Sequence, residues 1–279
     1  MSAPAGKTAD AAASVARLTP SFDGVTPLAA PAPAVDPAVR ISHVTKRYGS
    51  GPIVLEDVSL DIAPGEFVCL LGASGCGKST LLNLIAGLEK TTAGDIQTPA
   101  TGASVMFQES ALMPWLTARQ NVELALRLRG VPRAQRRDEA MRLLGTVNLA
   151  EARDKRPHEL SGGMRQRVAL ARALAQDRDV LLMDEPFAAL DAITRDLLHE
   201  ELERVWRATG RTIVFVTHNV REAARLGQRV ILLSSRPGRV AGEWHIANTR
   251  GRRIESPEVA ALATEITAEL RKEIARNAS

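Results

Sequence analysis

One nine-residue stretch constrains the fold of this chain more than any other: Gly72-Ala73-Ser74-Gly75-Cys76-Gly77-Lys78-Ser79-Thr80. It matches the pattern G-x-x-x-x-G-K-[ST], which binds phosphate groups. The largely apolar residues 66–71 before it are typical of a buried strand, and residues 81–88 after it place Leu and Ile at helical spacing. The order of strand, glycine-rich turn and helix predicts a loop whose backbone N–H groups surround a phosphate chain.

Two side chains of this loop add chemistry to its backbone. Lys78 places a cation on the outer phosphates, and the hydroxyl of Ser79 is a suitable ligand for Mg²⁺. Many unrelated activities share such a loop, so by itself it predicts phosphate binding and leaves the reaction open.

Polar residues follow directly after other apolar runs. Residues 179–183 precede Asp184-Glu185, and residues 212–217 precede His218. These runs alternate with helical patterns, which favours a parallel α/β sheet. Ligands bind at the carboxyl ends of the strands in such sheets. We therefore expect the phosphate loop, the carboxylate pair and His218 to meet at one edge.

The residue types at this edge fit phosphate chemistry. Asp184 is expected to hold Mg²⁺, and Glu185 to act as the general base that polarises a water molecule. His218 is suited to hydrogen bonding with the terminal phosphate. Gln108 is the polar last residue of a short predicted strand at 105–108 and is suited to orienting water or contacting Mg²⁺.

Composition restricts where this chain works. Hydrophobic residues make up 45% of the 279, which is ordinary for a globular protein, and the formal charge of +4 singles out no partner. The only cysteines, Cys69 and Cys76, lack metal-site spacing, which favours a reduced, cytosolic chain. No apolar run approaches the roughly 18 residues of a membrane span. Any role at a membrane is therefore expected to act through a partner.

The pentapeptide Leu160-Ser161-Gly162-Gly163-Met164 resembles the signature motif of ABC-type ATPases. Together with the phosphate loop, Asp184-Glu185, Leu190-Asp191 and His218, it is similar to the motif set of that family in order and spacing, over roughly residues 39–240. The resemblance implies an α/β fold, a P-loop ABC-type ATPase domain with a parallel-sheet core, an antiparallel β subdomain and an inserted helical subdomain.

The resemblance divides the chain into three parts and implies a role for each matching residue. We expect a disordered Ala/Pro-rich arm over 1–38, an ATPase domain over 39–245 with its helical subdomain at about 110–165, and a C-terminal helical extension over 246–279. The implied catalytic residues are Lys78, Gln108, Glu185 and His218, and the implied Mg²⁺ ligands are Ser79, Gln108 and Asp184. The implied nucleotide-binding residues begin with Tyr48, which is expected to stack on adenine. They include the whole phosphate loop: Gly72, Ala73, Ser74, Gly75, Cys76, Gly77, Lys78, Ser79 and Thr80. The opposite subunit is expected to contribute Ser161, Gly162, Gly163 and Asp191.

Two positions depart from the family pattern. Met164 stands where glutamine is commoner, and Ala189 stands before Leu190 where serine is commoner. Both side chains are expected to weaken contacts between subunits, and neither departure removes a catalytic group.

Within the family, Met164 and residues 109–117 and 235–239 are most similar to the ATP-binding subunits of nitrate, sulfonate and taurine importers. This resemblance implies a subunit that hydrolyses ATP with Mg²⁺ and powers uptake of a small anion. Its implied partners are a second copy in a homodimer, a separate integral-membrane permease and, indirectly, a periplasmic binding protein. The implied location is the cytoplasmic face of the inner membrane, as a peripheral protein.

An ATPase subunit of an exporter or a lipid-trafficking complex carries the same motifs and stays open as an alternative. An ATPase that acts on DNA or ribosomes is disfavoured, because residues 81–159 are too few for a long coiled coil and there is one cassette. No nucleic acid partner is therefore expected.

Two segments allow two interpretations each. Residues 112–116 cluster large apolar side chains around Trp115, which form either the core of the helical subdomain or a groove for a permease helix. Residues 257–276 predict an amphipathic helix that packs on its own core or serves regulation. Its expected apolar face comprises Val259, Leu262, Ile266, Leu270 and Ile274.

Overall fold

The computed structural model describes residues 36–246 and 252–276. The predicted arm at residues 1–38 lies outside the described residues except for its last three positions. Residues 247–251 and 277–279 of the predicted C-terminal extension also lie outside them.

A three-stranded antiparallel sheet begins the described fold, with strand order β2-β1-β4. Its strands are β1 (Val39–Arg47), β2 (Ile53–Ile62) and β4 (Ala93–Gln97). Alternating buried and exposed residues in β1 and β2 produce one apolar face, as expected for a half-exposed sheet. This is the expected antiparallel β subdomain, although β4 was not predicted, because most of its side chains are exposed and polar or small.

A second sheet has six strands in the order β5-β6-β7-β3-β8-β9. The first five strands of that order are parallel, and β9 runs antiparallel to β8. The strands are β3 (Phe67–Gly72), β5 (Ala103–Met106), β6 (Val180–Asp184), β7 (Thr212–Val216), β8 (Arg229–Leu233) and β9 (Val240–His245). The predicted parallel core is confirmed, and β9 is an edge strand that the sequence did not predict.

Alternate residues of the parallel strands enter two different apolar cores. In β3, Val68 and Leu70 pack with the antiparallel sheet and α1 (Lys78–Ile85), whereas Phe67 and Cys69 pack with the helices on the other face. Both faces are therefore covered, which explains why these strands read as continuous apolar runs in the sequence.

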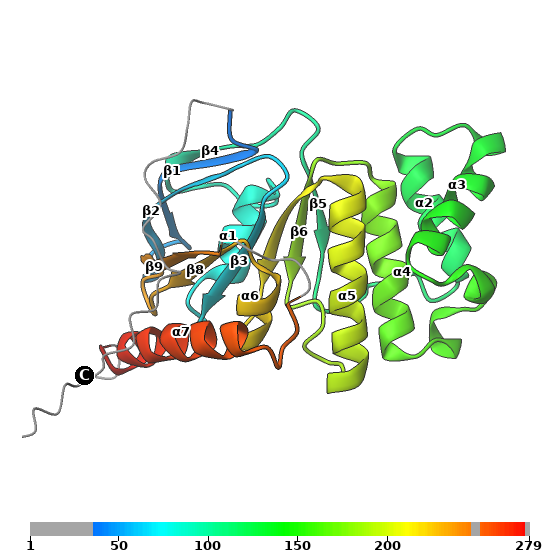
Figure 1. Ribbon diagram of the computed structural model, residues 1–279. Coiled ribbons are helices and arrows are strands. Elements are labelled where there is room, and N and C mark those ends of the chain that lie inside the picture. The colour runs from blue at the N-terminus through cyan, green and yellow to red at the C-terminus, as the bar shows by residue number, and fades with distance from the viewer. Residues whose placement is uncertain (1–35, 247–251, 277–279) are drawn as a thin grey trace, which may run out of the picture. The chain divides into compact units, whose positions relative to one another are not determined.

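Helices cover the second face of the sheet. Figure 1 shows α2 and α3 next to α4, and α5 between α4 and the strands. The helical elements of this region are α2 (Ala118–Leu128), α3 (Arg133–Thr146), the 3₁₀ turns η1 (Ala150–Ala152) and η2 (Pro157–Glu159), α4 (Gly162–Ala175) and α5 (Ala192–Thr209). From β5 to α4 the chain contains only helices and turns, as expected of an inserted helical segment.

The C-terminal helix is present as α7 (Pro257–Arg276), beside α6 (Val220–Leu226). Val259 and Ile266 are buried as predicted, but Ile274 is 48% exposed. The predicted apolar face is therefore wrong at its last position, because the buried stripe of α7 continues through Glu273, which is 6% exposed, and leaves Ile274 beside it. No helix in the described ranges is long and apolar enough to cross a bilayer.

Candidate active site

The phosphate loop lies between the end of β3 and the start of α1. Gly75 and Gly77 have φ angles of +76° and +100°, which favour glycine. A Cβ atom at Gly77 would also lie 2.7 Å from Leu55 Cδ2. The ammonium of Lys78 is buried inside the loop and donates to the carbonyl oxygens of Gly72 at 2.9 Å and Ala73 at 3.0 Å. A cation held within a curved backbone is the arrangement that an incoming phosphate chain needs.

Asp184 ends β6, where the register pairs it with Val216 of β7. Burial raises the pKa of the Asp184 carboxyl, and the charge of Glu185 raises it further, while a hydrogen bond from Ser79 and the charge of Lys78 lower it. The oxygen donors of Ser79 and Asp184 are therefore neighbours, and hard oxygen ligands are those that Mg²⁺ prefers.

This donor set fits a magnesium ion bound together with phosphate. The described residues contain no group of three or more His, Cys, Asp or Glu side chains that could hold a metal alone. Mg²⁺ commonly uses one or two protein oxygens and completes its shell with substrate phosphates and water.

Glu185 and His218 contact each other directly at the same sheet edge. His218 Nδ1 lies 2.8 Å from Glu185 Oε2. Glu185 has a φ of 43°, an uncommon left-handed conformation for a residue with a side chain, and its N–H donates to the Val216 carbonyl at 3.0 Å. Such backbone strain concentrates at functional sites. The two residues come from neighbouring strands, so the sheet itself brings them together.

Tyr48 lies beside the loop rather than in the core. Its hydroxyl donates to Glu89 Oε2 at 2.5 Å, and the Lys46 ammonium lies 4.5 Å from the ring centroid. Burial and the neighbouring Glu89 raise the pKa of Tyr48, whereas a hydrogen bond with Thr80 lowers it. The ring is 48% exposed, so aromatic surface remains for stacking against a base.

Gln108 is exposed, and its backbone rather than its side chain is fixed. Gln166 of α4 donates to the Gln108 carbonyl at 2.8 Å. Arg172, one and a half turns further along α4, donates to the carbonyl oxygens of Ser110 at 2.8 Å and Ala111 at 2.6 Å. The segment that leaves the sheet edge at Gln108 is therefore fastened to the helix that begins with the signature motif.

The signature residues lie beside Asp191. Ser161 caps α4 by accepting from the Met164 N–H, and Asp191 caps α5 by accepting from the Thr194 N–H. A Cβ atom at Gly163 would lie 2.5 Å from Thr194 Cγ2, so glycine is needed for the two helix starts to approach. Within the described ranges, no hydrogen bond or ion pair joins Ser161, Gly162 or Gly163 to the phosphate loop.

Several side chains around the site were not predicted from the sequence. A Cβ atom at Gly75 would lie 3.1 Å from a guanidinium nitrogen of Arg236, which places this arginine against the phosphate loop. Arg236 belongs to the segment 235–239, which indicated only a branch of the family. No local sequence pattern indicated Gln166 or Glu89, because the hydrogen-bond partner of each, Gln108 and Tyr48, is distant in the sequence.

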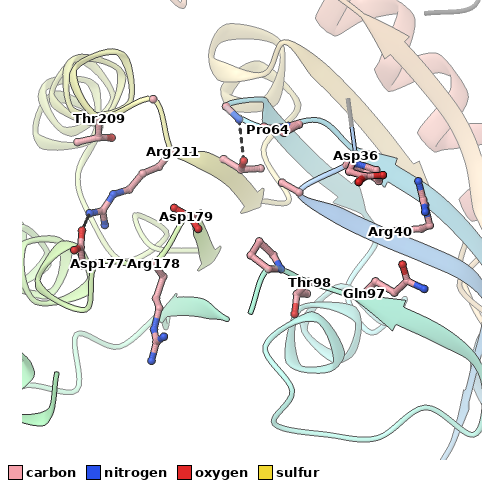
Figure 2. Close-up of a pocket in the computed structure, with 16 residues that line it drawn as sticks. Asp36, Arg40, Pro64, Gln97, Thr98, Asp177, Arg178, Asp179, Thr209 and Arg211 are labelled. Atoms are coloured by element: carbon pink, nitrogen blue, oxygen red, sulfur yellow. Dashed lines mark hydrogen bonds and ion pairs between the residues drawn. The ribbon is translucent and has the colours of Figure 1, made fainter. Parts of the chain in front are cut away.

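A cavity of about 720 Å³ lies elsewhere, at the amino ends of the parallel strands (Figure 2). Its lining includes Gly65 before β3, Asp179 before β6 and Thr212 at the start of β7. Charged side chains there pair with one another, as Arg211 does with Asp177 at 2.9 Å. None of the predicted site residues lines this cavity, and ligands of such sheets bind at the opposite edge, so it is not the active site.

Comparison with known proteins gives a consistent result. The family model described as "ABC transporter" matches residues 55–188. A taurine import ATP-binding protein of Chromobacterium violaceum is 44% identical over 250 residues, which cover 84% of this chain and 95% of that protein. Its counterpart in Rhizobium johnstonii is 45% identical over 248 residues, which cover 85% and 94%.

The fold is also similar to solved structures. The dimeric ATP-binding cassette MJ0796, in a post-hydrolysis state bound to ADP and Pi, superposes with a TM-score of 0.66 at 35% identity. That match covers 77% of this chain and 100% of the cassette.

Proposed function

The chain belongs to the ABC transporter family of ATP-binding proteins, and from this membership we propose that it powers an importer of small anions through a separate permease. The anion class is nitrate, a sulfonate or taurine. Support comes from relatives named for taurine import, whose similarity extends over 84% and 85% of this chain. An ATPase subunit of an exporter or lipid-trafficking complex is the alternative.

The phosphate loop would bind the phosphates of ATP, and Tyr48 would stack on its adenine. Lys78 then has to exchange the carbonyl oxygens of Gly72 and Ala73 for phosphate oxygens. Bound Mg²⁺ would neutralise phosphate charge, and Ser79, Asp184 and Gln108 are the side chains proposed to hold it.

The observation that carries the proposed chemistry is the contact of 2.8 Å between Glu185 and His218 at the edge that also holds the phosphate loop. In this arrangement Glu185 accepts a proton from the attacking water, and His218 holds the carboxylate in place and reaches the terminal phosphate. No other carboxylate in the described chain combines a loop position at this edge with a histidine partner.

A complete site would need two copies of the chain. Ser161, Gly162 and Gly163 lie with Asp191 at the starts of α4 and α5, and have no recorded bond to their own phosphate loop among the described residues. In a head-to-tail homodimer they would close on the γ-phosphate held by the partner. The dimeric cassettes with similar folds support this arrangement.

Glu185→Gln tests the proposal. The variant should bind ATP, form a stable dimer with it, and hydrolyse it about 10²- to 10⁴-fold more slowly, because the amide keeps the shape and removes the base. Phosphate release and light scattering measure the two effects. Glu151→Gln, an exposed change on η1, is the matched control. Parental turnover in Glu185→Gln would place the general base elsewhere.

The transported anion is tested separately. The chain should co-purify with a permease, and a cognate binding protein loaded with taurine, another sulfonate or nitrate should stimulate ATP hydrolysis by that complex. Stimulation without any binding protein, or by a lipid, would favour the exporter or lipid-trafficking alternative.

A further inference from the structure

A buried carboxylate lies directly behind the catalytic edge. Glu222 is on the first turn of α6, and its side chain is 7% exposed. The Thr217 hydroxyl donates to Glu222 Oε2 at 2.6 Å and accepts from the Asn219 N–H at 2.9 Å. Thr217 immediately precedes His218, so Glu222 fixes the backbone on both sides of that histidine.

The other oxygen of Glu222 faces α5. Arg195 Nε lies 3.4 Å from Glu222 Oε1, and His199 Nε2 lies 3.6 Å from the same atom. A second nitrogen of Arg195 donates to the Leu190 carbonyl at 2.6 Å. Leu190 immediately precedes Asp191, so this series of contacts extends from the loop of His218 to the loop of Asp191.

His199 extends the contacts to the loop that follows Glu185. This ring is fully buried and packs edge-on against Phe187, with centroids 5.5 Å apart. Phe187 lies two residues after Glu185. We call Thr217, Glu222, Arg195 and His199 the Glu222 cluster. It contacts the residues directly before His218 and Asp191, and Phe187, two residues after Glu185.

The charge of Glu222 is maintained although its surroundings are apolar. Burial acts to raise its pKa, but the hydrogen bond from Thr217 and the neighbouring His199 and Arg195 outweigh burial, so the pKa of Glu222 is lowered. The neighbouring residues Ala223, Ala224 and Leu226 are buried and apolar. Because a buried ionic cluster is often no more stable than apolar packing, stability alone does not explain this one.

We propose that Glu222 is a positioning residue that couples the loop of His218 to the loop of Asp191, so that the two loops adopt the hydrolytic arrangement together. The proposal rests on the function proposed above, because it concerns the same ATPase site. The contact between Glu222 and Thr217 sets where the His218 ring can lie. Arg195 contacts both Glu222 and the Leu190 carbonyl, so the position of Glu222 also affects the backbone next to Asp191.

Glu222→Gln removes the charge and keeps an acceptor for the Thr217 hydroxyl. We expect kcat to fall at least tenfold, while the ATP dissociation constant changes less than twofold, because the phosphate loop makes no recorded contact with Glu222. Thr217→Val, nearly the same shape without the hydroxyl, should produce the same pattern.

A double-mutant cycle separates positioning from a structural role. If Glu222 acts through His218, then Glu222→Gln combined with His218→Ala should be no slower than His218→Ala alone. If Glu222 has only a structural role, the double variant should lose kcat by the product of the two single-variant fold-losses.

Glu201→Gln is the matched control. Like Glu222, Glu201 is a buried carboxylate with charged neighbours, but it lies on α5, where Arg167 Nε is 2.9 Å from Glu201 Oε2. It should lower the melting temperature and leave kcat within twofold of the parent.

The outcomes are distinct. An unchanged kcat in folded Glu222→Gln, or multiplicative losses in the cycle, would overturn the positioning role. Failure of both Glu222→Gln and Thr217→Val to fold would also overturn it, since the cluster would then be a folding determinant. Lys78→Ala is a separate control. If this variant retained ATP hydrolysis, the proposed function itself would fail, independently of the result of the double-mutant cycle.

Discussion

Asp184, a proposed ligand of Mg²⁺, carries a charge that lowers the stability of the fold. Burial at the end of β6 raises its pKa, so folding favours the protonated carboxyl. Such a group contributes stability below its unfolded pKa and loses that contribution as pH rises through the folded pKa. At neutral pH the charged carboxylate therefore lowers the free energy of unfolding, and the proposed Mg²⁺ would offset this loss.

Asp184→Asn should accordingly raise the melting temperature of the nucleotide-free protein at pH 7. The gain should shrink as pH falls towards about 4, where an ordinary aspartate is half protonated. The variant should also lose the extra stabilisation that Mg²⁺ adds to bound ATP. Calorimetry between pH 4 and 8, with and without MgATP, measures both effects. A variant less stable than the parent at pH 7 would contradict the assignment of this cost to Asp184.

At the scale of elements, α7 shows the limits of reading a helix face from spacing. Its apolar residues follow a helical repeat, but only part of that face has a surface to cover. Val259 and Ala263 pack with Ala224 of α6, and Ile266 belongs to the main core of the helical face. Near the end of the helix Glu273 takes the buried position, and Ile274 beside it is exposed.

Ile266→Ala should destabilise the protein by about 2–5 kcal/mol, because it removes buried methyl groups and leaves a cavity. Ile274→Ala, the same change on the same helix, should stay within about 0.5 kcal/mol of the parent, since the residue is exposed. Urea unfolding of the two variants measures the difference. Equal losses would show that α7 packs along its whole length in solution.

At the scale of the whole molecule, we propose that the exposed segment around Trp115 contacts the permease. Trp115 is 68% exposed, so the interpretation of this residue as core of the helical segment is wrong. The segment is nevertheless ordered, because the buried Asn121 side chain bonds the backbone of Met113, Leu116 and Thr117. An exposed tryptophan on a fixed backbone is a suitable interface anchor.

Trp115→Ala should leave the melting temperature and ATP binding unchanged and weaken association with the permease by about 2 kcal/mol or more. Co-purification at several protein concentrations measures the loss. Leu128→Ala, at an 81% exposed position at the end of α2, is the matched control and should associate normally. Full association by Trp115→Ala would place the coupling surface elsewhere.

The sequence by itself determined which residues meet at this edge of the sheet. The phosphate loop, Asp184-Glu185 and His218 each follow an apolar strand, and parallel strands bring their carboxyl ends to one side, so order along the chain was enough to place them together. The signature motif added the family, because its glycines at a helix start are a local pattern.

Only the tertiary structure decided the partners that hold these residues. Gln166 donates to the Gln108 carbonyl from 58 residues away, and Glu89 accepts from the Tyr48 hydroxyl 41 residues away. Arg236 reaches Gly75 from the hairpin between β8 and β9. The Glu222 cluster likewise joins α5 to α6 through side chains that no local repeat marks. Such pairs depend on how strands and helices pack in three dimensions, and packing is a property of the folded whole that no spacing along the chain records.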